Sequence, residues 1–260
     1  LQVWKFPSPL HGLYNSLTIP LQGFCMTSLK DIKLFTTQSH ACSYLPDEKA
    51  QTLFIDPEFH VDRSCNTRLS EIGFRRSGSH IYRPNCKNCQ QCISCRVLIQ
   101  QFEPGSRFKR ILKRNADLTV SQVDNIEDNE YFYLYRQYIT VRHADGDMYP
   151  ATREQYTSFL LNQCDGTQYF AIRRNERLLG LMVTDRLNNA LSAVYTFYDP
   201  LEEKRSLGSF AILWQIMEAR RLGLSYLYLG YWIRGSRKMQ YKIEYRPMEM
   251  LVRQRWILVT

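Results

Sequence analysis

The sequence lacks any apolar run that approaches the roughly 18–20 residues needed to cross a bilayer, so it predicts no membrane-spanning helix. Residues 1–22 lack the basic start, apolar core and small-residue cleavage site of a signal peptide. The chain also has no internal repeat and no low-complexity tract, which argues against a repeat architecture. We therefore expect a cytoplasmic protein with no membrane partner.

What is present is enough apolar material for a folded core. Hydrophobic residues make up 44% of the 260 residues, with 17 Tyr and 13 Phe, which excludes a disordered chain. This length suits one large domain or two modest ones.

The charge is basic and unevenly placed. Lys and Arg number 34 against 25 Asp and Glu, for a net charge of +9. Segment 106–115 has five basic residues and no acid, and from Arg220 to Arg246 seven basic residues meet one acid, Glu244. Localised basic patches favour a phosphate-rich partner, although a solvated basic surface is the simpler interpretation.

The acidic, turn-rich segment 121–130 is the best place for a boundary, and we expect one half at 1–125 and another at 126–260. In the first half, 79–84 and 95–102 have the composition of strands. Strands and helices are expected at further positions. These are a basic helix at 106–118, amphipathic helices at 129–143 and 153–161, and strands at 169–174, 177–187 and 190–200.

Segment 206–233 gives the clearest pattern in the chain. Phe210, Leu213, Trp214 and Met217 form one helical stripe, and a strand-like run follows at 225–233. Ser206 or Ser209 suits the N-cap of this helix and Gly223 the position just after its end. Strand, helix and strand in this order predict a right-handed βαβ unit.

The start of this helix is also a place for an anion. Gly208 lies in its first turn, and Lys204 and Arg205 stand just before it. Unpaired backbone N–H groups and the helix dipole favour negative charge there. The arrangement resembles the phosphate-binding turn of acyltransferases that use a phosphate-bearing carrier.

Four cysteines occur at a strict spacing of three, within a chain that has eight. Such thiols, or three of them with a fourth from elsewhere, can hold zinc or an iron–sulfur cluster. No second C-x2-C or His pair lies at the usual distance, so a Cys-rich turn without metal is the competing interpretation. The possible ligands are Cys42, Cys86, Cys89, Cys92 and Cys95.

Several motifs together resemble one family, the aminoacyl-tRNA–protein transferases. They are "ACSYLPDEKAQTLFID", "CNTRLSEIGFRRSGSHIYRPNCKNCQQC", "RNADL", "TFYDP", the 206–233 segment and "KMQYKIEYRPMEML". The resemblance runs from about Cys42 to Leu251. Two departures stand out: Ser236 occupies a position where relatives commonly have Cys, and Cys95 is an additional thiol. A thiol that Ser236 can replace argues against a cysteine nucleophile in this turn.

The resemblance implies an α/β fold of two acetyltransferase-like (GNAT-like) mixed-sheet halves packed together. It implies transfer of leucine from leucyl-tRNA to the α-amine of proteins that begin with Asp or Glu, which creates a bacterial N-degron. Arginyl transfer to the same acceptors is the alternative. The first half is then expected to recognise the acceptor, and the second to bind aminoacyl-tRNA and carry out transfer. No cofactor is required, because the donor is an activated ester.

Candidate site residues follow from this expected chemistry. A cation must hold the acceptor carboxylate, a base or polariser must help the amine, and cations and aromatic rings must hold tRNA. For the acceptor we select Arg75, Arg76, His80, Tyr82 and Arg83. For catalysis we select Lys238, Tyr241, Tyr195 and Asp199, although an Asp-Pro turn is the simpler role for Asp199. For tRNA we select Arg107, Lys109, Arg110, Lys113, Arg114, Lys204, Arg205, Gly208, Trp232, Arg237 and Lys242.

Two further expectations can be checked against the structure. Lys238 and Lys242 lie on one face if their segment is helical, and Trp232 with Tyr231 stacks on the terminal adenine, lines the leucine pocket or belongs to the core. Two other functions stay open: a non-catalytic nucleic-acid-binding protein built on the cysteines, and a coenzyme A-dependent acetyltransferase.

Overall fold

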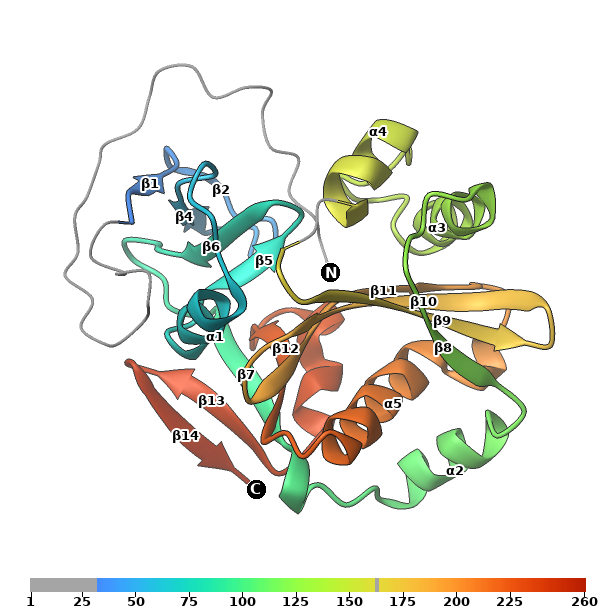
Figure 1. Cartoon of the computed structure of the whole chain (residues 1–260). Coiled ribbons are helices and arrows are strands. Elements are labelled where there is room, and N and C mark those ends of the chain that lie inside the picture. Colours follow the sequence, from blue (N-terminus) through green and yellow to red (C-terminus); the bar gives the residue numbers. More distant parts are fainter. Residues whose placement is uncertain (1–31, 162–163) are drawn as a thin grey trace.

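The computed structural model describes residues 32–161 and 164–260, and residues 1–22, considered above for a signal peptide, lie outside this range. Two β-sheets dominate the described chain, one of four strands and one of eight (Figure 1). Among the described residues, none of the helices combines the length and apolar character that a membrane span requires.

The four-stranded sheet is formed by the first part of the chain. Its order is β1-β4-β6-β5, and a helix, α1, packs against it through Leu69 and Cys65. Asp62 caps this helix, because its Oδ1 accepts a hydrogen bond from the Cys65 N–H at 2.7 Å. The bounds are β1 Leu34–Thr36, β4 Thr52–Ile55, α1 Arg63–Glu71, β5 Arg75–Ser77 and β6 His80–Pro84, with a separate two-stranded pair β2 His40–Ala41 and β3 Lys49–Ala50.

The eight-stranded sheet has the order β14-β13-β7-β12-β11-β10-β9-β8. Its strands pair antiparallel except for β11 and β12, which pair in parallel. The bounds are β7 Ile93–Leu98, β8 Thr119–Val123, β9 Thr167–Arg174, β10 Arg177–Arg186, β11 Ala190–Tyr198, β12 Tyr226–Trp232, β13 Met248–Val252 and β14 Arg255–Val259.

Helices cover both faces of the large sheet (Figure 1). On one face, α5 and α2 bury Phe210, Leu213 and Phe108 against the strands. On the other face, α3 and α4 bury residues such as Tyr135 and Tyr156. The bounds are α2 Ser106–Arg114, α3 Asn129–Arg142, α4 Arg153–Tyr156 followed by a π-helical turn η3 Thr157–Leu161, and α5 Leu207–Arg221, with 3-10 helices η2 Ile99–Gln101, η4 Glu203–Arg205 and η5 Arg237–Glu244.

The predicted secondary structure is confirmed along most of the described chain. The βαβ prediction is confirmed by β11, α5 and the parallel pairing of β12. Ser206 is the N-cap of α5, and Gly223 follows the helix with a φ of +68°, the left-handed conformation that suits glycine. Pro84 is the last residue of β6.

The α/β class is confirmed, but the sheets are not two equivalent halves. Strands β7 and β8, which precede the expected boundary at 125, belong to the same sheet as the strands of the second half. The division of labour between 1–125 and 126–260 stays a prediction.

Candidate active site between strands β11 and β12

Strands β11 and β12 separate part-way along the large sheet. Their pairing ends at Ser192 and Tyr228. Just beyond, each strand has a bulge, because Val194 is an extra residue in the β10–β11 ladder and Leu229 in the β7–β12 ladder. Bulges bend a strand and increase its twist, so the two strands diverge after this point.

A cavity of about 510 Å³ lies where the two strands separate, next to the start of α5. Ala193 on β11 and Leu229 on β12 lie at its wall, with Leu207 and Ile212 from α5. The cavity therefore has an apolar wall that comes from the bulged part of the sheet and from the helix that connects the two strands.

The N-terminus of α5 opens toward this cavity. Ser206, Gly208 and Ser209 line it, and Ser206 makes no capping hydrogen bond with its side chain. A Cβ at Gly208 would lie 3.1 Å from Cε1 of Tyr198, so glycine permits the ring of Tyr198 to lie against the helix start. The first-turn N–H groups, uncapped by this serine, provide donors for an anion or for a carbonyl oxygen.

Four tyrosines give the cavity its polar character. They are Tyr138, Tyr195, Tyr198 and Tyr241. The ring centroids of Tyr138 and Tyr198 lie 4.9 Å apart, and the Tyr195 hydroxyl donates to Sδ of Met148 at 3.7 Å. Burial raises the pKa of Tyr138, Tyr195 and Tyr241 well above the usual range for a phenol. These hydroxyls are therefore neutral at pH 7 and act as hydrogen-bonding groups rather than as phenolate bases.

Charged side chains at the cavity are largely tied into ion pairs. Lys238 Nζ lies 3.1 Å from Asp145, and Arg142 lies 3.1 Å from Glu203. Glu202 lies 3.2 Å from Arg205 and 3.4 Å from Arg177. Each charged side chain of the lining named here therefore has a partner of opposite sign.

His143 also lines the cavity, at the end of α3. Burial lowers the pKa of this imidazole to about 4, so the ring is neutral at pH 7. Sequence reasoning missed His143, Tyr138, Tyr198, Glu202 and Glu203. The sequence offers only weak signals for them: His143 ends a predicted amphipathic helix that also contains Tyr138, and Tyr198 lies in the "TFYDP" motif.

The structure brings three of the four predicted catalytic residues together. Tyr195, Tyr241 and Lys238 all line the cavity. Asp199 does not, because its carboxylate is buried against Arg177 at 2.5 Å and accepts a hydrogen bond from the Leu201 N–H. Its observed contacts are those of a residue that fixes the Asp-Pro turn.

The predicted basic helix lies beside the cavity. Phe108 and Ile111 of α2 are buried, which leaves its five basic side chains on the exposed face. Arg114 donates to the Lys204 carbonyl, and Asn115 Nδ2 donates to the Arg205 carbonyl at 2.9 Å. These bonds fix the C-terminal end of α2 against the loop that leads into α5.

The other residues selected for tRNA lie in different surroundings. Lys204 and Arg237 are exposed, whereas Arg205 pairs with Asp117 at 2.8 Å and Arg107 pairs with Glu244. Trp232 packs against the core cluster around α5.

The expectation that Lys238 and Lys242 share a face is wrong. The segment is a 3-10 helix, with about three residues per turn, so side chains four apart diverge. Lys238 is exposed, whereas Lys242 is fully buried and its Nζ donates to the Tyr231 carbonyl at 2.6 Å. Burial lowers the pKa of Lys242 to about 8.

The residues selected for the acceptor are mostly used inside the protein. Arg75 and Arg76 are buried in β5, and Arg76 forms a bidentate ion pair with Asp185 of β10 at 2.7 Å. Tyr82 is in edge contact with Tyr231. His80 is partly buried in ring contact with Phe54, and Arg83 lies over Phe74 and donates to the Ile72 carbonyl at 3.1 Å.

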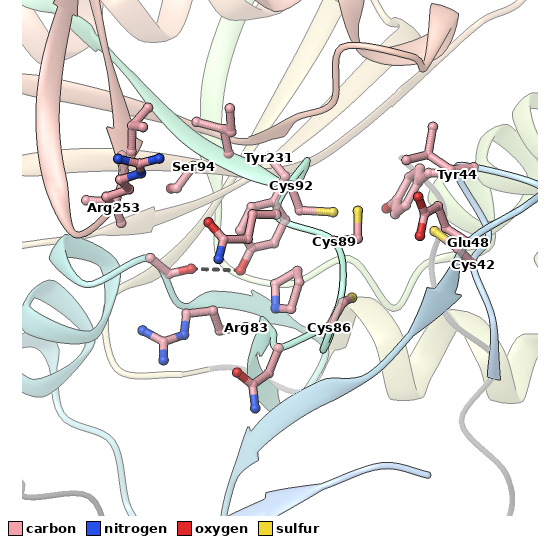
Figure 2. Close-up of a pocket in the computed structure, with 18 of the residues that line it drawn as sticks. Cys42, Tyr44, Glu48, Arg83, Cys86, Cys89, Cys92, Ser94, Tyr231 and Arg253 are labelled. Atoms are coloured by element: carbon pink, nitrogen blue, oxygen red, sulfur yellow. Dashed lines mark hydrogen bonds between the residues drawn. The ribbon is translucent and has the colours of Figure 1, made fainter. Parts of the chain in front are cut away.

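Arg83 belongs to a second cavity of about 510 Å³, which also contains four of the cysteines. Figure 2 shows the sulfur atoms of Cys42, Cys86, Cys89 and Cys92 around one part of this cavity. Burial raises the pKa of Cys92 to about 12, and the neighbouring thiols add to the shift. Cys92 is thus a neutral thiol at pH 7 and a poor nucleophile.

Cys95 lies apart from these four residues. It is fully buried in β7, and its Sγ donates to the Gly230 carbonyl at 3.3 Å. The described cysteines are free thiols, and over residues 32–161 and 164–260 no three His, Cys, Asp or Glu side chains are arranged to hold a metal ion. Metal binding at the cysteines stays a prediction.

Two family models match the chain. Residues 40–110 match "Arginine-tRNA-protein transferase, N terminus" and residues 130–252 match "Arginine-tRNA-protein transferase, C terminus". The chain belongs to this family. The predicted resemblance is therefore confirmed, and the cavity, α5 and η5 all lie within the segment that matches the C-terminal model.

Relatives within the family match over nearly all of this chain. The aspartate/glutamate leucyltransferase of Pseudomonas fluorescens strain Pf0-1 is 53% identical over 234 residues, which cover 90% of this chain and 100% of that protein. Proteins of the same name from Pseudomonas aeruginosa strain LESB58 and Stutzerimonas stutzeri strain A1501 are 54% and 55% identical over 235 residues, with the same coverage. Among solved structures, the crystal structure of FemX matches with a TM-score of 0.43 and 10% identity, over 76% of this chain and 79% of that chain.

Proposed function

We propose that this protein transfers leucine from leucyl-tRNA to the N-terminal α-amine of proteins that begin with Asp or Glu. The observation that carries the proposal is the identity of 53–55% to aspartate/glutamate leucyltransferases over their whole length. The reaction takes place where leucyl-tRNA occurs, in the cytoplasm, and its product has the N-terminal leucine of a bacterial N-degron.

The cavity between β11 and β12 suits the donor end of the reaction. Its apolar wall of Ala193, Leu207, Ile212 and Leu229 matches a leucine side chain, and the N-terminus of α5 supplies donors for the terminal nucleotide or the ester carbonyl. The C-terminal end of α2 is bonded to the loop before that helix start, and the exposed basic side chains of α2 suit the phosphates of the acceptor stem. The βαβ unit thus serves as the acetyltransferase-like part of the protein.

The chemical step is aminolysis of an ester. The neutral α-amine attacks the leucyl carbonyl carbon, a C–N bond forms, and the bond between that carbon and the ribose oxygen breaks. One proton leaves the amine, and the released ribose oxygen takes one up. An α-amine has a pKa near 7.7–8.0, so a large fraction is already neutral near pH 7.5, and alignment of the two reactants provides most of the catalysis. No step passes through a metal or a cysteine.

Leucine is favoured over arginine by the state of the acids at the cavity. An arginine side chain needs a carboxylate that is free to form a bidentate pair. Glu202 is the less exposed acid of the lining, and it is held by two arginines, Arg205 and Arg177. Leu207 and Ile212 of α5, with Leu229 of β12, give the cavity an apolar wall that suits a leucine side chain.

We assign the acceptor carboxylate to Lys238. This side chain is exposed at the cavity, and its partner Asp145 is exposed as well. An exposed ion pair contributes little stability, so a substrate carboxylate can replace Asp145 at small cost. Lys238 then places the N-terminal residue of the acceptor beside the leucyl ester.

The test is a transfer assay with purified protein, leucyl-tRNA or arginyl-tRNA labelled in the amino acid, and peptides that differ only in their first residue. We expect acid-stable label from leucyl-tRNA on peptides that begin with Asp or Glu and none on a matched peptide that begins with Ala. Label from arginyl-tRNA in place of leucyl-tRNA would replace the donor in this proposal, and label on every peptide would refute acidic specificity.

A further inference from the structure

Arg75 lies at the point where β11 and β12 separate. Its Nη1 donates to Ser192 Oγ at 2.9 Å and its Nη2 donates to the Ala193 carbonyl at 3.0 Å, both on β11. On the other side its guanidinium lies against Gly230 of β12, where an added Cβ would be 3.3 Å from Nη2. One planar group therefore touches both strands at the point where their pairing ends.

Gly230 is suited to this contact in two ways. Its φ of +80° is the left-handed conformation that other residues adopt only with strain, and it has no side chain to displace the guanidinium. It follows the extra residue Leu229, so the bulge of β12 and the position of Arg75 are parts of one arrangement.

Two more side chains hold the same bulge from other elements. Cys95 of β7 donates from Sγ to the Gly230 carbonyl at 3.3 Å, and Lys242 of η5 donates from Nζ to the Tyr231 carbonyl at 2.6 Å. Residues 230 and 231 are thus fixed by groups from β5, β7 and η5. These contacts restrain the bulge next to Leu229, which lines the cavity.

The electrostatic state of Arg75 is unusual for a buried arginine. Its side chain donates to a hydroxyl and a carbonyl, and within the described residues it has no carboxylate partner, whereas the adjacent Arg76 has Asp185. Burial of a cation without a carboxylate is costly. Its field reaches the cavity, because its charge lowers the pKa of Tyr241 against the larger effect of burial.

From this geometry we infer that Arg75 is a positioning residue for the donor cavity: its guanidinium keeps β11 and β12 apart and sets Ala193 and Leu229 at the wall where the leucyl ester binds. The inference rests on the proposed function. It differs from direct recognition of the acceptor, because Arg75 acts through the two strands and not on a substrate.

The experiment compares Arg75→Ala and Arg75→Lys with the wild-type protein in the leucine transfer assay. We expect Arg75→Ala to lower kcat about 100-fold while the KM for the acceptor peptide changes less than about threefold, since a misplaced ester loses its alignment with the amine. Guanidinium chloride at tens of millimolar, far below denaturing concentrations, should raise the kcat of Arg75→Ala at least about tenfold, because a guanidinium ion can occupy the vacated space. Arg75→Lys keeps the positive charge but not the planar guanidinium, and we expect its kcat to be about tenfold below that of the wild type.

Arg136→Ala is the matched control, because Arg136 is exposed on α3 and contacts Tyr133. We expect it to leave kcat unchanged. If Arg75→Ala fails to fold, as judged by circular dichroism, Arg75→Lys decides, and kcat within threefold of wild type in that variant overturns the inference. A folded Arg75→Ala variant with unchanged kcat, with its loss confined to the acceptor KM, or with no response to guanidinium also overturns it.

Wild-type protein in the same assay separates failure of the proposed function from failure of the role of Arg75. Absence of leucine transfer by the wild type refutes the proposed function and this inference with it. Transfer by the wild type and by Arg75→Ala at the same kcat refutes the role of Arg75 alone.

Discussion

The ion pair between Arg76 and Asp185 joins the two sheets, and its removal should have a large and specific effect. Arg76 Nε and Nη2 donate to the two oxygens of Asp185, each at 2.7 Å, and both side chains are 2% exposed. Nη1 donates to the Gly78 carbonyl, and Thr167 Oγ1 donates to Asp185 Oδ1 at 2.9 Å. Arg76→Met removes both of these charge-assisted bonds and leaves the buried carboxylate with the hydrogen bond from Thr167.

The expected magnitude follows from the burial of both groups. Loss of one partner of a buried pair costs about 3–5 kcal/mol, because the remaining charge is uncompensated. We therefore expect Arg76→Met and Asp185→Leu each to lower the free energy of unfolding by that amount. The double variant removes both charges, and we expect it to be more stable than either single variant.

Urea unfolding followed by circular dichroism, for wild type, both single variants and the double variant, provides the measurement. A cost of less than about 1 kcal/mol for either single substitution would refute a buried ion pair of this strength. Costs that add in the double variant would refute it too, since addition would mean that the groups do not interact. Arg136→Ala again serves as the surface control.

Three further predictions concern the buried Lys242, the exposed Lys238 and the basic helix α2. Burial lowers the pKa of Lys242 to about 8, from 10.5 in the unfolded chain. Between these two pH values the unfolded chain binds a proton that the folded protein does not, so the free energy of unfolding should rise with pH. We expect wild type to gain about 2 kcal/mol relative to Lys242→Met between pH 7 and 9.5 in urea unfolding, and a parallel pH dependence of the two proteins would contradict this. Lys238→Ala should raise the KM for a peptide that begins with Asp by about tenfold and leave the KM for leucyl-tRNA unchanged; equal effects on both would place Lys238 elsewhere. Arg110→Ala should reduce the slope of log affinity for leucyl-tRNA against log salt by about 0.7–0.9, with Arg136→Ala as the control, and an unchanged slope would remove α2 from the tRNA interface.

Local patterns in the sequence were sufficient to predict much of the fold. The helical stripe that includes Phe210 and Leu213, with a serine before it and Gly223 after it, predicts α5 because burial and capping act within one helix. The parallel pairing of β11 and β12 follows because a strand, a helix and a strand in sequence leave few other arrangements.

Long-range contacts could not be predicted in this way. Arg75 and Arg76 are adjacent arginines with different partners. Arg75 donates to the backbone of β11, whereas Arg76 pairs with Asp185, because successive residues of a strand point to opposite faces. Nothing near them in sequence identifies these partners. Likewise the period of the 237–244 segment decides whether Lys242 is exposed or buried, and the sequence pattern does not distinguish a 3-10 helix from an α-helix.

The position of β7 has a consequence for synthesis of the chain. This strand lies between β12 and β13, and both of these partners begin at or after Tyr226. While the ribosome makes the residues that intervene, β7 has two unpaired edges, a state that exposes a nascent chain to misassociation. We expect the large sheet to close only when synthesis is nearly finished, so an early stop codon that removes β13 and β14 should yield aggregated protein rather than a smaller working enzyme.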